Sequence, residues 1–269
     1  MRSMPTELTA THPYALPNTW ELSRRRLDLL AATHNPTSFR YAEALGVGPG
    51  LRCLEAGAGQ GSFARWLAPR VGSTGGVVAA DVDPRWLEGL EAPNLEVRRM
   101  DLETDDLPEA AFDFVHTRFV LMHLPSRDDV LRWLAAAVRP GGVLMLEEGG
   151  IHPVPATAAG GYLDAWLAFQ RMMRTAGVDT EWASGLPERL DALGLVGVGA
   201  DFEGQIFRGG SELAQFWSLT WLQVRDRIVA TGSPSEVVDE GRAALADASR
   251  WFHAPGTIIA WGRRAEAQS

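Results

Sequence analysis

The 269-residue chain contains a single cysteine, Cys53, which excludes an intrachain disulfide. Because Cys53 lies in a predicted strand, we expect a buried thiol rather than a nucleophile. No apolar run approaches the ~18 residues of a membrane span, and residues 1–17 lack the apolar segment of a secretory signal. Basic residues are few: 25 Lys and Arg stand against 34 Asp and Glu, a formal net charge of −9. These absences predict a cytoplasmic protein that binds neither nucleic acid nor anionic membranes.

Short apolar runs alternate with helical patterns in the first part of the chain. Continuous apolar runs such as 77–80 are typical of strands buried on both faces. Five alternations of strand and helix indicate a parallel sheet with helices on both sides. The predicted strands are 51–56, 77–80, 95–100, 111–117 and 143–147.

Two helices are predicted before the sheet. The sequence from Asn18 to Glu21 forms a capping box for a helix that ends near Thr33. Asn35 and Pro36 supply a cap and a first-turn proline for a second helix, which ends at Gly46.

Helical patterns dominate the second part of the chain, at 160–176, 211–230 and 235–251. They exceed what the sheet needs for its crossovers, and we interpret them as a lid. Their aromatic residues recur at helical spacing, which more often indicates core packing than a substrate wall; they are Tyr162, Trp166, Phe169, Trp217 and Trp221. We expect one integrated domain with three parts: an arm and helices at 1–50, the core at 51–150, and at 151–269 the lid with the last two strands, 195–202 and 257–263.

The first predicted strand ends in a turn with glycines at alternate positions, Gly57, Gly59 and Gly61. Such glycines admit positive φ and let a ligand approach the backbone, and the following helix directs free N–H groups toward the turn. Ser62 stands where a dinucleotide fingerprint has its third glycine, and the Gly-Lys-Ser/Thr of a phosphate-binding loop is absent. Asp81, at the end of the second strand, can accept hydrogen bonds from ribose hydroxyls. The pattern therefore predicts a pocket for a nucleoside without phosphates.

The run from Leu54 to Gly61 resembles the glycine motif of the class I S-adenosylmethionine-dependent methyltransferases, with the acidic Glu55 ahead of the glycines. Further segments match the family in the same order, including stretches typical of its small-molecule, natural-product branch: 80–84, 100–102, 112–115, 121–124 and 139–144. The resemblance covers about residues 51–148. It implies a Rossmann-like, doubly wound, mostly parallel seven-stranded sheet with an antiparallel last strand.

The resemblance also implies a binding site for S-adenosylmethionine, and no metal. Glu55 would organise the methionine ammonium and Asp81 would bind the ribose hydroxyls. Asp101 would accept a hydrogen bond from the adenine amino group, and Arg118 would pair with the methionine carboxylate. The full set of implied cofactor residues is Glu55, Gly57, Gly59, Gly61, Asp81, Val82, Asp101, Leu102, Thr117 and Arg118.

Methyl transfer needs a general base only when the acceptor must lose a proton. The candidates lie beyond the fifth strand, Glu148 and His152, with the more distant His253 as a third. His116 and His123 are either buried structural histidines or, for His123, part of the pocket. Glu147 is interpreted as a solvated charge at the strand end.

The predicted reaction is methyl transfer to a small apolar or aromatic secondary metabolite, with a carbon, nitrogen or oxygen acceptor atom. The Asp/Asn-Pro-Pro-Tyr signature of nucleic-acid amino methylation is absent, since Thr117 to Val120 occupy that place. An alternative is a family member that binds S-adenosylmethionine but catalyses a cyclisation or rearrangement. A nicotinamide oxidoreductase is a third hypothesis, opposed by Ser62. We expect a monomer or homodimer.

Overall fold

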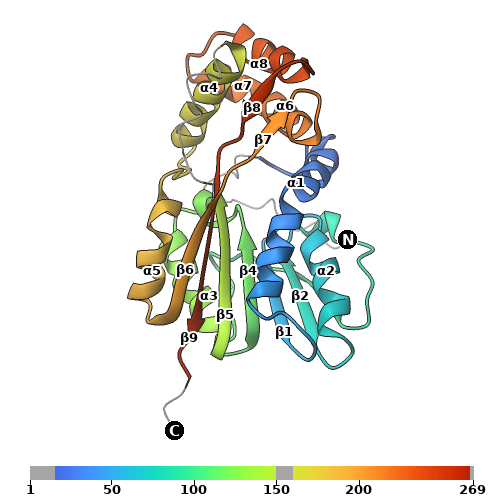
Figure 1. Ribbon diagram of the computed structural model, residues 1–269, viewed down its shortest axis with the longest axis vertical. Helices are drawn as coiled ribbons and strands as arrows, with labels where there is room; N and C mark the ends of the chain where they lie inside the picture. Colours follow the sequence, from blue (N-terminus) through green and yellow to red (C-terminus); the bar gives the residue numbers. More distant parts are fainter. Residues whose placement is uncertain (1–15, 150–159, 267–269) are drawn as a thin grey trace, which may run out of the picture.

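The computed structural model describes residues 16–149 and 160–266. A seven-stranded sheet with helices on both faces forms one end of the molecule, and a group of helices forms the other (Figure 1). The strands of the sheet are β1 Arg52–Ala56, β2 Gly76–Asp81, β3 Leu95–Arg99, β4 Phe112–Arg118, β5 Val138–Gly149, β6 Leu195–Glu203 and β9 Thr257–Arg264. A separate pair is formed by β7 Ile206–Arg208 and β8 Trp251–His253.

The large sheet has the strand order β3-β2-β1-β4-β5-β9-β6. The first five strands run parallel, and β9 lies antiparallel between β5 and β6. The predicted fold class is therefore confirmed. The chain runs outward from β1 through β2 to β3 and then returns to form β4 on the other side of β1. In such sheets ligands bind at the carboxyl ends of the strands beside this reversal of strand order.

Alternate side chains of the buried strands enter two different cores. Cys53, on β1, packs with Phe63 of the helix that follows the glycine turn. Leu54, the next residue, packs on the other face, with Leu131 and Leu134. The helices beside the sheet are α1 Ser23–Ala44, α2 Ser62–Val71, α3 Arg127–Ala137 and α5 Leu186–Ala192.

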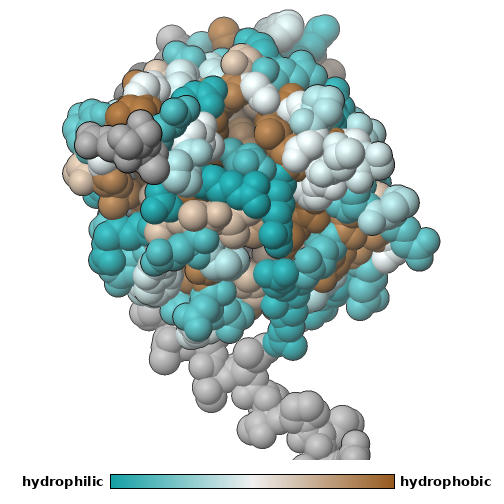
Figure 2. All heavy atoms as spheres, turned by 90° about the horizontal axis from the view of Figure 1, so that it is seen from below, coloured by the Kyte–Doolittle hydropathy of each residue, from teal (hydrophilic) through white to brown (hydrophobic). Residues whose placement is uncertain are grey.

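The second part of the chain builds the lid around a third core. Its helices are α4 Gly161–Thr175, α6 Glu212–Gln223, α7 Arg225–Ala230 and α8 Glu236–Ala246. Short 3₁₀ turns complete the described elements: η1 Pro84–Trp86, η2 Leu121–His123 and η4 Trp182–Gly185. The lid lies above the carboxyl ends of the parallel strands, and hydrophilic residues cover much of the opposite end of the molecule (Figures 1 and 2). No helix in the described ranges is long and apolar enough to cross a membrane.

The prediction of two helices before the sheet is wrong. One helix, α1, runs through Asn35 and Pro36 without a break. A proline within a helix removes one backbone hydrogen bond, but α1 is fixed from outside by packing and by side-chain contacts with the sheet. The capping box is also absent, because the helix begins at Ser23 and its N-cap, Leu22, makes no side-chain bond.

Two further boundaries differ from the prediction. The helix expected over 211–230 divides at Val224 into α6 and α7. The helix expected to end near Trp251 ends at Ala246, and the chain then forms β8, which pairs with β7. Each of these strands has only three residues, too few to give a periodic signal in the sequence.

Candidate active site

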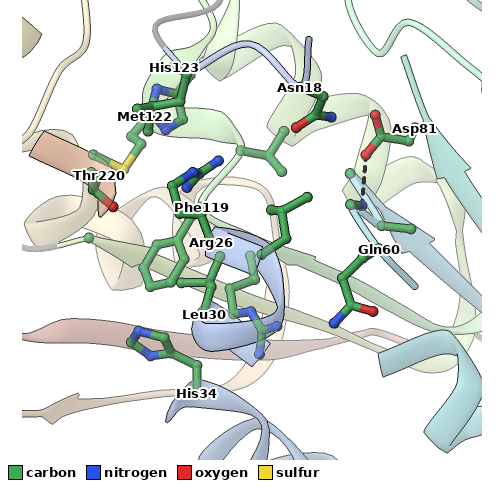
Figure 3. Close-up of a pocket in the computed structure, with 18 of the residues that line it drawn as sticks. Asn18, Arg26, Leu30, His34, Gln60, Asp81, Phe119, Met122, His123 and Thr220 are labelled. Carbon is green, nitrogen blue, oxygen red and sulfur yellow. Dashed lines mark hydrogen bonds between the residues drawn. The ribbon is translucent and has the colours of Figure 1, made fainter. Parts of the chain in front are cut away.

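A cavity of about 460 Å³ lies between the carboxyl ends of the parallel strands, α1 and the lid. Figure 3 shows Asp81 and Gln60 on one side of it and Met122, His123 and Thr220 on the other. We call the side formed by the ends of β1, β2, β3 and β4 the strand-end wall. The side formed by α4 and α6 is called the lid wall, and α1 lines the cavity between the two.

The glycine turn after β1 has the backbone conformation that the sequence predicts. Gly57, Gly59 and Gly61 have φ values of 74°, 57° and 72°, which L residues rarely adopt. A Cβ at Gly57 would lie 2.2 Å from Cγ2 of Val120. Gly57 and Gly59 line the cavity, whereas an added Cβ at Gly61 would meet Leu87 and Leu90 outside it. Gly61 therefore permits close packing and is not placed to contact a ligand.

Asp81 is fixed at the end of β2 by two backbone amides. Its Oδ2 accepts the N–H of Gly59 at 2.8 Å and its Oδ1 accepts the N–H of Asp83 at 2.9 Å. Burial raises the pKa of this carboxyl, and the two amide hydrogen bonds act in the opposite direction. The carboxylate lines the cavity in one defined orientation.

Further along the strand-end wall, Val82, Asp101 and Leu102 also border the cavity. Oδ1 of Asp101 accepts the N–H of Glu103 at 3.0 Å. Val82 is 49% exposed, whereas Leu102 is buried. Three predicted residues of the adenosine half therefore lie together on one wall with Asp81.

Glu55 is a buried carboxyl at the end of β1 that also lines the cavity. Its Oε2 accepts the N–H of Ala64, in the first turn of α2, at 2.7 Å. Burial raises its pKa to about 8, although the charge of Arg118 acts to lower it. A cation bound next to Glu55 would favour the ionised form.

Arg118, at the end of β4, connects the strand-end wall to α1. Its guanidinium donates to Oγ of Ser38 at 2.7 Å and to Oδ1 of Asn35 at 3.0 Å. The same Asn35 oxygen accepts a hydrogen bond from Ser62 at 3.3 Å. Asn35 is thus part of a partly buried polar network and not the helix cap that its position before proline predicts.

Thr117 does not border the cavity, although it belongs to the set of residues that the resemblance implies for the cofactor. It is fully buried within the sheet ladder, opposite Ala56 and Leu146. The residues that reach the cavity are the ones that follow β4 or end it, Arg118 and Phe119.

Glu147 is buried, so its interpretation as a solvated charge is wrong. It is 1% exposed and accepts a hydrogen bond from Nε2 of His116 at 2.8 Å. Burial alone would raise the pKa of Glu147, but the hydrogen bond from His116 holds it below its ordinary value. Burial lowers the pKa of His116. The pair is therefore a neutral imidazole that donates to a carboxylate, and it is a structural pair inside the sheet.

None of the three predicted bases is found in the described cavity wall. Glu148 is fully buried, and its two oxygens accept the N–H groups of Val120, Leu121 and Met122 at 2.8–3.3 Å. Its role is to hold the turn after β4, because the amides already occupy its oxygens. His253 lies on β8, away from the cavity lining, and His152 falls outside the described residues.

Two other histidines do line the cavity, His34 on α1 and His123 on η2. Burial lowers the pKa of His34 to about 3, and burial with the charge of Arg26 lowers that of His123 to about 4. Both imidazoles are therefore neutral at pH 7. The sequence did not decide whether His123 lines the pocket or is a buried structural histidine. It gave no signal for His34, which occupies an ordinary position in a helical pattern.

The aromatic residues of the lid divide between cavity and core. Trp166, Phe169 and Trp217 line the cavity, with Trp166 and Trp217 in an edge-to-face contact at 5.0 Å. Tyr162 and Trp221 are fully buried and belong to the lid core. The expectation of core packing is correct for the second group and incomplete for the first.

The sequence matches the family model described as a methyltransferase domain over residues 21–183. Among curated proteins, it is 34% identical over 114 residues to the ubiquinone/menaquinone biosynthesis C-methyltransferase UbiE of Ectopseudomonas mendocina, a match that covers 39% of this chain and 44% of that protein. The UbiE of Laribacter hongkongensis is 32% identical over 112 residues, covering 38% and 45%. The chain thus spans about half the length of the curated relatives it matches.

Solved structures with little sequence identity share the fold. The YcgJ protein of Bacillus subtilis has a TM-score of 0.58 at 16% identity, covering 87% of this chain and 100% of that one. Phosphoethanolamine N-methyltransferase 2 of Haemonchus contortus, crystallised with phosphomonomethylethanolamine and S-adenosylhomocysteine, has a TM-score of 0.55 at 15% identity, covering 90% and 53%. The family model spans more than half of the chain, and its range includes the glycine turn and the fixed carboxylate of Asp81, which border the cavity. The chain belongs to the class I S-adenosylmethionine-dependent methyltransferases.

Proposed function

We propose that this enzyme transfers the methyl group of S-adenosylmethionine to a small apolar or aromatic acceptor bound against the lid. The observation that carries the proposal is that one cavity is lined by both the strand-end wall and the aromatic side chains of the lid wall. A cofactor on the first wall and an acceptor on the second would share one enclosed space.

The residues of the strand-end wall fit the parts of the cofactor. Asp81 would accept the ribose hydroxyls, because its orientation is fixed by the amides of Gly59 and Asp83. Asp101 would accept from the adenine amino group. Glu55 would hold the ammonium and Arg118 the carboxylate of the methionine part, and their opposite charges suit those groups.

When bound, S-adenosylmethionine supplies a methyl group on a sulfonium: the acceptor atom would bond to the methyl carbon in line with the carbon–sulfur bond, and the sulfur would leave as S-adenosylhomocysteine. The chain's own contribution is position and the exclusion of water, an approach effect that can supply several kcal/mol. Trp166, Phe169 and Trp217 offer flat apolar surfaces for this purpose. The neutral imidazoles of His34 and His123 can accept a hydrogen bond from an acceptor hydroxyl.

The curated relatives support a small-molecule acceptor but not a particular one. Their names describe C-methylation in ubiquinone and menaquinone biosynthesis, and the matches leave about half of their length uncovered. The acceptor would lie against the lid wall and α1, so its chemical class has to be argued from the residues of this chain.

The test is calorimetric titration with S-adenosylmethionine and, separately, with NAD. Wild type should bind S-adenosylmethionine at micromolar concentrations and should not bind NAD. Asp81→Ala should weaken S-adenosylmethionine binding by about 10- to 100-fold, since a charge-assisted hydrogen bond contributes about 1.5–3 kcal/mol. Glu96→Ala, at an exposed residue on β3, is the matched control and should bind as wild type does. A folded wild-type protein that does not bind S-adenosylmethionine would overturn the proposal.

A further inference from the structure

Three consecutive arginines at the start of α1 differ sharply in their surroundings. Arg24 pairs with Asp28 on the surface, and Arg25 donates to Gln215 of α6 at 3.2 Å. Arg26 is only 3% exposed and lines the cavity. The helix thus turns one cation of the three toward the inside of the enzyme.

Arg26 lies near the lid wall and away from the cofactor groups assigned to the strand-end wall. Figure 3 shows it among Phe119, Met122 and His123, whereas Asp81 lies across the cavity. The charge of Arg26 contributes to the lowered pKa of His123, which places the two groups within electrostatic reach. Asn35, which holds Arg118, is nine residues further along α1, about 13 Å at 1.5 Å per residue. Arg118 and Arg26 therefore serve different parts of the cavity.

The charges of the cavity wall are divided between its two sides. Every acidic residue among the described lining residues comes from the strand-end wall or the loops beside it: Glu55, Asp81, Asp83, Asp101 and Glu103. The described lining residues of α1, α4 and α6 include no acid and one arginine, Arg26. On the first side the lining cation is Arg118, which donates to Ser38 and Asn35 and is assigned to the cofactor. A negative charge on an acceptor would therefore be attracted to the second side, where Arg26 lies and the described lining residues include no acid.

We propose that the acceptor is an aromatic carboxylic acid, with its ring against the lid wall and its carboxylate on the guanidinium of Arg26. This inference rests on the proposed function and names the substrate class of the same site. A guanidinium has five N–H donors in a planar fork that matches a carboxylate, so it can keep its place in the wall and still bind a ligand. Apolar neighbours such as Leu30 and Met122 exclude water, and a charge contact is stronger there than in solvent.

The ring would lie between aromatic side chains that are already arranged at right angles. Trp166 and Trp217 meet at 87°, and Phe169 and Trp217 at 77°, with centroids 5.0 and 5.9 Å apart. Such an arrangement presents both faces and edges to a flat ligand. The acceptor class therefore combines one planar apolar part with one anionic end.

The experiment compares acids with their uncharged amides. Hydroxybenzoates, hydroxynaphthoates and hydroxycinnamates, each with its primary amide, are titrated at saturating S-adenosylhomocysteine, with tryptophan fluorescence as the readout. We expect at least one acid to bind wild type tenfold or more tighter than its amide. Arg26→Gln should reduce that ratio to about one without changing the Kd of S-adenosylhomocysteine, and the exposed neighbour variant Arg25→Gln should keep the wild-type ratio.

Other outcomes overturn the proposal. Equal binding of acids and amides by wild type would do so, as would an acid preference that survives in Arg26→Gln or a folded, cofactor-bound enzyme that binds no member of the panel. Arg26→Lys keeps the charge and should keep part of the acid preference, which covers the case in which Arg26→Gln does not fold. Loss of S-adenosylhomocysteine binding in wild type would instead count against the proposed function, and the acid-to-amide ratio would then be measured without it.

Discussion

The strand-end wall and the lid wall face the same cavity but are built in different ways. On the strand-end wall, main-chain groups fix the functional atoms: Asp81 accepts two backbone amides and Glu55 accepts one. On the lid wall, helices present aromatic side chains that are held by one another, as Trp166 and Trp217 are.

This difference predicts how each wall responds to change. A site fixed by the backbone depends on a few residues with an unusual conformation and has little tolerance at those positions. A site made of packed side chains can be altered in shape while the helices that carry it remain folded. The following substitutions test that contrast, beginning with the largest expected effect.

Gly57→Ala should have the largest effect. It combines a left-handed backbone, which costs about 1–2 kcal/mol, with overlap against Val120, for which about 1–3 kcal/mol is typical. We expect the free energy of unfolding to fall by about 2–5 kcal/mol and S-adenosylmethionine binding to be lost. Chemical denaturation and calorimetry would measure the two losses.

Gly59→Ala is the matched control for the steric part. Its φ is also positive, at 57°, but an added Cβ has only Leu27 within 4 Å, at 3.9 Å. The loss of stability should therefore be limited to about 1–2 kcal/mol. Equal losses in the two variants would show that contact with Val120 is not what restricts Gly57.

The lid tryptophans should separate stability from acceptor binding. Trp221→Phe leaves a void in a fully buried core, and we expect a loss of about 1–3 kcal/mol. Trp217→Phe borders the cavity and encloses no new void, so its loss should stay below about 1 kcal/mol. The KM for the acceptor should change several-fold in Trp217→Phe and remain unchanged in Trp221→Phe; the reverse pattern would contradict the assignment of the lid wall.

Glu55 should give a smaller, pH-dependent effect. Burial raises the pKa of Glu55 from its ordinary value of 4.5 to about 8. Between these two pH values the folded protein keeps a proton on Glu55, whereas the unfolded chain has released it. The free energy of unfolding should therefore fall as pH rises toward 8, by at most about 1.4 kcal/mol per pH unit for this group. His34 and His123 reduce the free energy of unfolding only below pH 6.5, because their pKa values are lowered in the folded protein.

Denaturation between pH 6.5 and 8 would isolate this contribution. Glu55→Gln should make the decline shallower, and Glu148, whose pKa is raised to about 7, should account for part of the remainder. The exposed variant Glu96→Gln should leave the slope as in wild type. An unchanged slope in Glu55→Gln would mean that this carboxyl is ionised in the folded protein.

The same contrast between the walls explains what the sequence could predict. The strand-end wall follows from short motifs, because Gly57, Gly59 and Asp81 each occupy a fixed place relative to a strand end. The alternation of apolar runs likewise predicted the sheet. In the structure Thr117, Gly61 and Glu148 lie away from the cavity. Spacing along the sequence did not predict this, because it does not show on which face of a turn or strand a residue lies.

The part of the cavity lined by α1 and the lid wall was much less predictable from the sequence. Pro36 carries the local signal of a helix start, but contacts of α1 with the sheet, through Asn35 and Ser38, override it. His34 and Arg26 lie in an ordinary helical pattern and reach the cavity only because of how α1 packs. Long-range packing of this kind cannot be predicted from the pattern of neighbouring residues in a short window of the sequence.

The short pair β7 and β8 brings together the two ends of a long segment. Ile206 pairs with His253 and Arg208 with Trp251, so the chain between them, which carries α6, α7 and α8, leaves and rejoins the fold at one place. In evolutionary terms this segment is one contiguous unit: it contributes no strand to the large sheet, and α6 and α8 pack on α1 and α4. Since Trp217 and Thr220 of the cavity lie within it, a change confined to this one stretch of the gene would alter part of the lid wall and leave the residues of the strand-end wall as they are.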